Sequence, residues 1–121
     1  MIQVGNAGDK GRGVFAQRRI AQGEVIECVP VIVLSDPQWQ IIEQTTLKDY
    51  YYAWGDGIAL ALGFAALYNH SYTPNAVYIK HIEEQTVEFV ALRDIEAGEE
   101  ITVNYNGRPD DLSPVWFTPV L

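Results

Sequence analysis

The chain has 121 residues, of which 48% are hydrophobic and 20% are charged, a balance typical of one folded globular domain. Sixteen acidic residues against eight basic ones give a net charge of −8, which leaves too little basic surface for direct binding of nucleic acid. The single cysteine, Cys28, excludes an internal disulfide and a cysteine zinc site, and with two histidines no metal site is predicted.

The first half of the chain is predicted to be mainly extended. Residues 1–6 lack the charged, apolar and small-residue regions of a signal peptide, and no apolar run approaches the ~20 residues of a membrane span, so a cytoplasmic protein without membrane contact is expected. Strands are predicted at 13–18 and at 24–34, where Pro30 marks a bulge or an edge. Residues 35–37, Ser-Asp-Pro, indicate the cap and first turn of a short helix.

The second half is predicted to contain more strands. Tyr50–Tyr52 favours an extended segment, residues 58–62 a buried strand, and residues 63–68 a short helical turn of small side chains. Residues 77–82 and 86–92 alternate in polarity and are predicted to pair through a turn at 83–85. A last strand is predicted at 101–105, before an irregular tail that contains three prolines. The expected fold class is therefore mainly β.

Residues 18–26 and 93–101 repeat one pattern, in which Arg, Ile, Gly, Glu and Ile recur in register. Two copies are too few for a solenoid, so we interpret them as one strand-turn-strand unit that is used twice. Gly23 and Gly98 are expected to provide a positive φ where the chain reverses. The polar residues around these glycines are expected to face solvent, and no chemistry is assigned to them.

Two loop segments could carry chemistry. The segment Gly11-Arg12-Gly13-Val14-Phe15-Ala16 has the glycine spacing of a dinucleotide fingerprint, but no helix is predicted after it, which disfavours that fold. It is either an ordinary hairpin turn or a turn at which the backbone approaches a ligand. In residues 69–75, the polar groups of Asn69 and His70 could read the edge of a purine, or the asparagines could only tie the backbone.

Aromatic residues gather around these segments. Packing alone would explain most of them, including a half-buried phenol at the end of the last strand. The functional interpretation is an apolar channel that holds a long cationic side chain by cation–π attraction. The residues concerned are Tyr50, Tyr51, Tyr52, Trp54, Tyr68, Tyr72, Tyr105, Trp116 and Phe117.

Taken in order, four segments resemble one family. They are KGRGVFA at 10–16, ALGFAALYNHS at 61–71, PNA at 74–76 and GEEITVNY at 98–105. Together they resemble the SET-domain family of S-adenosylmethionine-dependent protein lysine methyltransferases, and most resemble its minimal viral and bacterial members, which consist of the SET domain alone. The resemblance implies a β-clip-like fold of small curved sheets and short helices, with a SET domain at 1–107 and a tail at 108–121. It also implies a C-terminal pseudoknot that brings Asn69, His70 and Tyr105 to one site.

The resemblance further implies roles for individual residues. Tyr105 is expected to be the catalytic residue, with its hydroxyl at the methyl-transfer point, while Asn69 binds near the amino group of the cofactor and His70 contacts the adenine mainly by its backbone. The residues expected to bind S-adenosylmethionine are Lys10, Arg12, Gly13, Val14, Tyr50, Asn69 and His70. The residues expected to line the lysine channel are Tyr52, Tyr68, Tyr105, Trp116 and Phe117.

The sequence departs from the family pattern where the channel should be closed. Larger members carry cysteine-zinc segments on both sides of the domain, which a chain with one cysteine cannot form. The tail at 108–121, or the second subunit of a homodimer, is expected to close the channel instead. The expected partner is a lysine-rich protein or peptide, to which the charge of −8 is suited, although ordinary solubility also explains that charge. The alternative functions are a catalytically inactive SET-fold module that binds peptide and, more weakly supported, an enzyme acting on a small amine.

Overall fold

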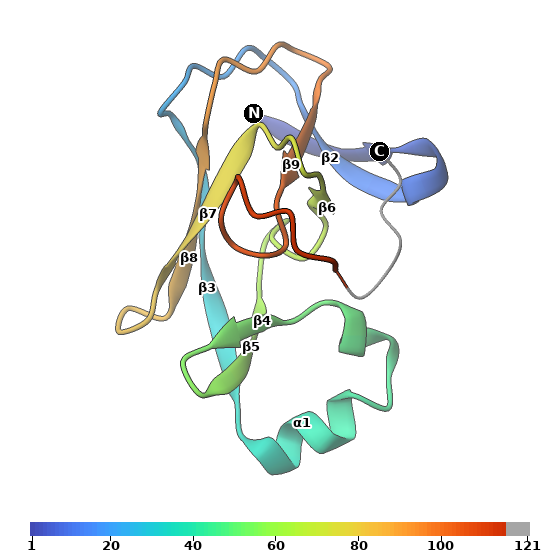
Figure 1. Cartoon of the computed structure of the whole chain (residues 1–121), viewed down its shortest axis with the longest axis vertical. Coiled ribbons are helices and arrows are strands. Elements are labelled where there is room, and N and C mark those ends of the chain that lie inside the picture. Colours follow the sequence, from blue (N-terminus) through green and yellow to red (C-terminus); the bar gives the residue numbers. More distant parts are fainter. Residues whose placement is uncertain (116–121) are drawn as a thin grey trace.

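The computed structural model describes residues 1–115, which form two β-sheets and little helix (Figure 1). The four-stranded sheet has the order β1 (Ile2–Asn6), β2 (Arg12–Ala16), β9 (Glu100–Val103) and β6 (Asn69–His70). The five-stranded sheet has the order β4 (Tyr52–Trp54), β5 (Gly57–Ala61), β3 (Val25–Leu34), β8 (Thr86–Ala91) and β7 (Ala76–His81). The predicted mainly β fold class is confirmed.

The long strand β3 changes partner in its middle. It pairs with β8 as far as Pro30 and with β5 from Val31 onward. The prediction of a bulge or an edge at Pro30 is wrong, since the register shift lies between Val25 and Glu27 and the strand is central in its sheet. The N–H and C=O groups of a strand residue point to the same side of the strand. An N–H at Pro30 would face β5, which starts to pair with β3 one residue later, so its loss removes no bond to β8.

The predicted helix is confirmed as α1 (Asp36–Ile42). A capping box begins it, in which the Ser35 hydroxyl accepts from the backbone N–H of Gln38 and the Gln38 side chain accepts from the backbone N–H of Ser35. A 3₁₀ turn, η2 (Thr46–Asp49), follows and leads directly to Tyr50. No helix within residues 1–115 is long and apolar enough to cross a membrane.

Some local details differ from the predictions. β1 is an additional strand. Gln3, Gly5 and Asn6 have low strand propensity, so the strand exists through its pairing with β2. The predicted short helical turn at 63–68 is present as successive turns over 63–67, closed by bonds from Ala65 N to Leu62 O and from Leu67 N to Phe64 O. The last strand ends at Val103 because the side chain of the next residue, Asn104, accepts from the N–H of Asn106 and turns the chain.

The repeated unit is confirmed, and its two copies pair with each other. Ile20 and Ile95 exchange two backbone hydrogen bonds of 2.8 Å, and both side chains are fully buried. The glycines at the two reversals, Gly23 and Gly98, have φ of 82° and 85°. Each turn is closed by an ion pair of the same kind, Arg18–Glu24 in one copy and Arg93–Glu99 in the other.

Candidate active site

The short strand β6 is held in place by the C-terminal strand. It pairs parallel with β9, placing Asn69 opposite Thr102 and His70 opposite Val103. The buried side chain of Asn75 donates to the carbonyl of Glu100 at 2.8 Å and accepts from the N–H of Thr102 at 2.9 Å. Asn75 is therefore a backbone tie, one of the two interpretations left open for this loop, and it fixes β9 beside β6.

Tyr105 lies against strand β6, which consists of Asn69 and His70. Its backbone N–H donates to His70 Nδ1 at 3.0 Å, and its hydroxyl donates to the main-chain carbonyl of Tyr68 at 2.6 Å. The Tyr78 hydroxyl donates to the carbonyl of Tyr105 at 3.2 Å. The structure thus brings Asn69, His70 and Tyr105 together, although more than 30 residues separate strand β6 from the tyrosine in the sequence.

The His70 ring is turned into the core, with 3% of the residue exposed. Because Nδ1 accepts from Tyr105, the ring proton is on Nε2, and burial lowers the pKa of His70, so the ring is neutral. The ring packs against Tyr72 and Tyr105 and lines neither of the pockets described below. A ring in this position cannot read a purine edge, and the predicted backbone contact with adenine stays a prediction.

A small pocket of about 190 Å³ lies beside Asn69. It is lined by Lys10, Gly11, Arg12, Tyr50, Ala66, Leu67, Asn69 and Tyr105. The Asn69 amide donates to Glu100 Oε2 at 2.7 Å and to the Arg12 carbonyl at 3.0 Å, and Lys10 Nζ donates to Glu100 Oε1 at 2.8 Å. Glu100 therefore orients two of the predicted cofactor residues, a role that the sequence did not reveal because Lys10 is 90 residues away.

The glycine turn is built for a close approach. A Cβ on Gly13 would lie 2.5 Å from Glu100 Oε2 and 2.9 Å from Asn69 Nδ2, so a side chain there would displace both groups. Gly13 and the fully buried Val14 lie in β2 and do not line the pocket, to which this segment contributes Gly11 and Arg12. The segment is part of the hairpin between β1 and β2, one of its two open interpretations, and the approach of its backbone to a ligand stays a prediction.

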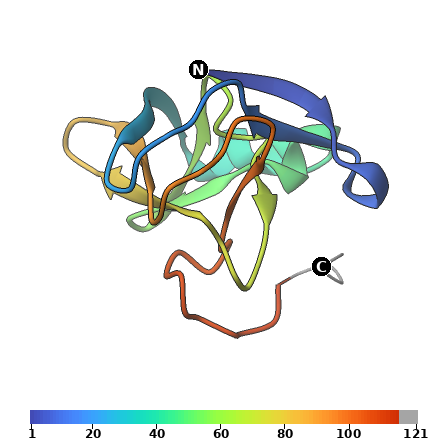
Figure 2. The same cartoon turned by 90° about the horizontal axis from the view of Figure 1, so that it is seen from above.

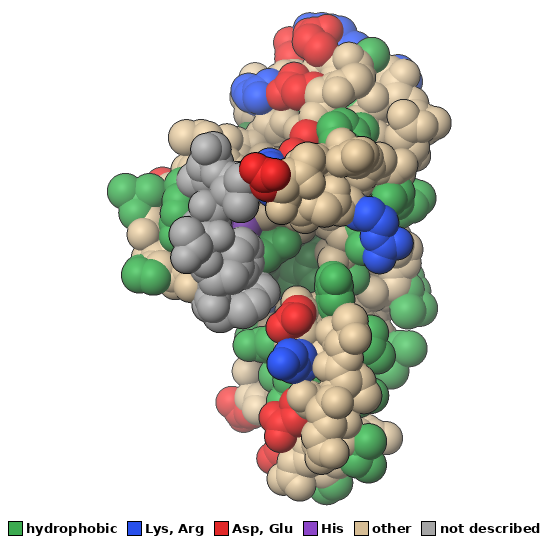
Figure 3. Space-filling model, turned by 90° about the vertical axis from the view of Figure 1, so that its right-hand side faces the viewer, with side chains coloured by type: hydrophobic (Ala, Val, Ile, Leu, Met, Phe, Trp, Pro, Cys, Tyr) green, Lys and Arg blue, Asp and Glu red, His purple; other side chains and the backbone are tan. Residues whose placement is uncertain are grey.

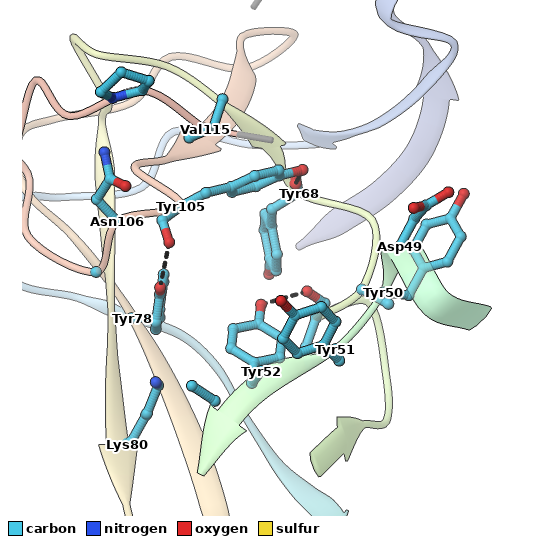
Figure 4. Close-up of a pocket in the computed structure, with 15 residues that line it drawn as sticks. Asp49, Tyr50, Tyr51, Tyr52, Tyr68, Tyr78, Lys80, Tyr105, Asn106 and Val115 are labelled. Carbon is cyan, nitrogen blue, oxygen red and sulfur yellow. Dashed lines mark hydrogen bonds between the residues drawn. The ribbon is translucent and has the colours of Figure 1, made fainter. Parts of the chain in front are cut away.

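A larger pocket of about 340 Å³ adjoins the first one. Figure 3 shows a hollow on this face with hydrophobic side chains inside it, and Figure 4 shows the tyrosines that surround the pocket. The three described residues predicted for the lysine channel, Tyr52, Tyr68 and Tyr105, all line it, and Trp116 and Phe117 lie outside the described residues. Other lining residues were not predicted, among them Tyr78, Lys80 and Asn106.

Four phenols of the larger pocket, those of Tyr52, Tyr68, Tyr78 and Tyr105, are neutral at neutral pH. Burial raises the pKa of Tyr52, Tyr68 and Tyr105 well above the usual value, and it raises the pKa of Tyr78 to about 12. The Tyr52 hydroxyl donates to the Ala65 carbonyl at 2.6 Å. These four tyrosines therefore form an uncharged, hydrogen-bonded wall, and none of them is ionised to act as a base.

The two pockets meet at Tyr105. Tyr50, Ala66 and Tyr105 line both of them, and residues from η2, β4, β6 and β7 surround this junction. The structure therefore provides one pocket with cations, an amide and backbone groups, and a second pocket with an aromatic wall. Two phenols, those of Tyr50 and Tyr105, line both pockets.

The segment after β9 turns back toward the loop that follows β6 (Figure 2). The Asn104 amide donates to the Asp111 carbonyl at 2.6 Å, and the Tyr72 hydroxyl donates to the Ser113 carbonyl at 3.0 Å. These bonds place Pro114 and Val115 in the lining of the larger pocket. Closure of the channel by residues 116–121 or by a second subunit stays a prediction, as does the threading of a pseudoknot.

Comparison with known proteins gives consistent results. The SET domain family model matches residues 11–106. A histone-lysine N-methyltransferase of Schizosaccharomyces pombe, specific for H3 lysine-37, is 33% identical over 118 residues, which are 96% of this chain and 76% of that protein. The crystal structure of a candidate histone methyltransferase of Plasmodium falciparum is 30% identical and superimposes with a TM-score of 0.73, covering 86% of this chain and 91% of the other.

Proposed function

This chain belongs to the SET-domain family, and we propose that it transfers a methyl group from S-adenosylmethionine to the side-chain amine of lysine in a basic protein. Protein-lysine methyltransferase activity follows from the family and from the relative that is a histone-lysine N-methyltransferase. The identity of the methyl donor and the basic character of the substrate rest on the chemistry of the two pockets and on the charge of the chain.

The observation that carries the proposal is the junction of the two pockets at Tyr105. Methyl transfer requires a donor and an acceptor that are aligned but held by different groups. Orientation of two reactants contributes roughly 7–11 kcal/mol to lowering a barrier in favourable cases. A polar pocket and an aromatic pocket that adjoin at Tyr105 meet this requirement.

The residues of the smaller pocket fit the amino-acid portion of S-adenosylmethionine. The ammonium of Lys10 can bind a carboxylate, while the carbonyl of Arg12 and the side-chain oxygen of Asn69 can accept from an ammonium group, with Lys10 and Asn69 both held by Glu100. The missing side chain at Gly13 leaves room for this arrangement. When bound, S-adenosylmethionine supplies a methyl group that is activated by the positive charge of its sulfur.

Tyr105 and its neighbours then orient the reacting groups. Donation by the Tyr105 hydroxyl to the Tyr68 carbonyl fixes the phenol oxygen at the junction, where it can accept weak C–H···O contacts of roughly 0.5–1 kcal/mol each. In the larger pocket, aromatic faces attract an incoming lysine, and desolvation lowers the pKa of its amine from about 10.4, which favours loss of the proton before transfer.

The test replaces the phenol at the junction and compares it with a matched tyrosine. Tyr105→Phe removes the bond to Tyr68 and should lower methyl transfer to basic proteins by about a hundredfold while cofactor binding survives. Tyr72 lines neither pocket, and Tyr72→Phe removes only the bond to the Ser113 carbonyl in the tail, so it should lower methyl transfer much less than Tyr105→Phe does. Asn69→Ala should instead weaken cofactor binding, measured by isothermal titration calorimetry.

Methylation at the parental rate by Tyr105→Phe would remove the role assigned to that phenol. A folded wild-type protein that binds basic peptides but never transfers label from labelled S-adenosylmethionine would favour the alternative of a binding module.

A further inference from the structure

A lysine of this protein lines the pocket proposed for the substrate lysine. On strand β7, residues Ala76, Tyr78 and Lys80 alternate onto one face, because side chains of a strand point to opposite sides in turn. Ala76 is fully buried, Tyr78 lines the larger pocket, and Lys80 pairs across the sheet with the fully buried Val87. Lys80 therefore occupies an inward position, at the end of a row that forms the pocket wall.

The ammonium of Lys80 lies close to this wall, and no carboxylate of residues 1–115 pairs with it. Its Nζ is 5.9 Å from the centre of the Tyr78 ring, and burial lowers the pKa of Lys80. The other charged residue in the described lining is Asp49, which Figure 4 shows on the far side of the tyrosines.

This placement poses an electrostatic problem. A pocket that admits a lysine gains from aromatic faces and from Asp49, but a second ammonium in its wall repels the entering one. If Lys80 only covered Val87 with its aliphatic stem, its ammonium could extend into open water and would not need to line a pocket. A carboxylate on the bound substrate would neutralise Lys80 and remove the repulsion.

Resting on the proposed function, we propose that Lys80 selects substrates in which an acidic side chain stands near the target lysine in sequence. The acidic side chain binds the Lys80 ammonium, while the target lysine enters between the tyrosines toward Tyr105. In an extended peptide, alternate residues face the same side, so the preference should appear at one flanking position or at two positions that are two residues apart.

The experiment uses a set of peptides with one lysine in a neutral sequence of glycine, serine and alanine. A single glutamate is moved through the flanking positions, and each peptide is matched by one with glutamine at the same place. Methylation gives kcat/KM, and fluorescence anisotropy gives the binding of each labelled peptide. For the wild type, we expect glutamate to exceed glutamine by about fivefold at the selected position.

Variants of Lys80 test whether its charge is responsible. The glutamate-to-glutamine ratio at that position should fall to about one in Lys80→Met, persist in Lys80→Arg, and invert in Lys80→Glu. Lys48→Met is the matched control, because it removes the same charge from an exposed lysine that is not in the pocket lining, and it should leave the ratio unchanged.

Each contrary result has a definite meaning. Equal ratios at all positions in the wild type, or a preference that survives in Lys80→Met, would overturn the selection by Lys80 while leaving lysine methylation intact. A methyl group found on Lys80 by mass spectrometry after incubation with the donor alone would also overturn it, because the ammonium would then be a substrate. If no peptide or basic protein is methylated, the proposed function fails, and the binding ratios still decide the role of Lys80.

Discussion

At the scale of single residues, a half-buried carboxylate supports the reacting tyrosine indirectly. The register shift between Val25 and Glu27 turns both Ile26 and Glu27 inward, which places a carboxylate on the apolar side of β3. Glu27 accepts from the Tyr68 hydroxyl at 2.8 Å, and the carbonyl of the same tyrosine accepts from Tyr105. Glu27 is thus a positioning residue that holds Tyr68, and through it the phenol at the junction of the pockets.

Glu27 should lower the stability of the protein as the pH rises. Burial raises the pKa of Glu27 despite the hydrogen bonds from Tyr68 and Phe64, so on titration from about pH 4 to about pH 7 the unfolded chain loses this proton before the folded one. Unfolding then becomes easier as Glu27 ionises. Glu27→Gln keeps an acceptor for Tyr68 without the charge, so its melting temperature relative to the wild type should increase across this range.

Glu24→Gln provides a control of opposite sign. Hydrogen bonds from Arg18 and from the N–H of Ala21 lower the pKa of Glu24, so its contribution to stability is present at neutral pH and is lost as the pH falls. The melting temperature of Glu24→Gln relative to the wild type should therefore decrease from about pH 4 to about pH 7. Parallel trends in the two variants would contradict the assignment of a half-buried, destabilising charge to Glu27.

At the scale of elements, the two copies of the repeated turn should respond alike to the same substitution. Gly98 has a φ of 85° with open space around its missing side chain, so Gly98→Ala incurs only the backbone penalty of a left-handed residue, about 1–2 kcal/mol of unfolding free energy. Gly23→Ala should cost the same amount. Urea denaturation measures both.

Gly57→Ala serves as the control in the same measurement. The φ of Gly57 is not in the left-handed region, and its Cβ would meet only ordinary contacts, with 3.6 Å to the Trp54 carbonyl. We expect little change in the unfolding free energy. If Gly98→Ala were as harmless as Gly57→Ala, positive φ would not be what the repeated glycines provide.

The elements also show what can be predicted from the sequence. Local signals were sufficient to predict α1, where the Ser35–Gln38 capping box and the proline within it act over four residues, and to predict the turns at Gly23 and Gly98. They were not sufficient for features that depend on a partner strand. Strand β1 exists because β2 pairs with it, and Pro30 is tolerated because its strand changes partner at that point.

The same distinction applies to the site. Tyr105, Asn69 and Lys10 could be named because their segments resemble a known family, and the structure places all three around one pocket. Tyr78 and Lys80 could not, because alternation along a strand shows which residues share a face but not what that face lines. The role of Glu100 could not be predicted either, because it depends on which distant side chains its carboxylate contacts.

At the scale of the whole molecule, the charge of −8 should govern how the substrate is captured. Attraction between an acidic enzyme and a lysine-rich protein is strong when the Debye length is about 30 Å, at about 0.01 M salt, and is largely screened when it is about 8 Å, at about 0.15 M salt. The KM for a lysine-rich protein should rise several-fold across this range, with kcat nearly constant. A neutral peptide with one lysine should show a much smaller change, and equal responses of both substrates would argue against attraction by net charge.

The position of β9 has a consequence for biosynthesis. β9 is the last strand of the described chain to leave the ribosome, yet it lies between β2 and β6 in its sheet. Until residues 100–103 emerge, the nascent protein carries an unpaired edge on β2, to which a strand of another polypeptide could add. A chain truncated before residue 100 would therefore be prone to aggregation as well as inactive, because the edge of β2 would stay exposed.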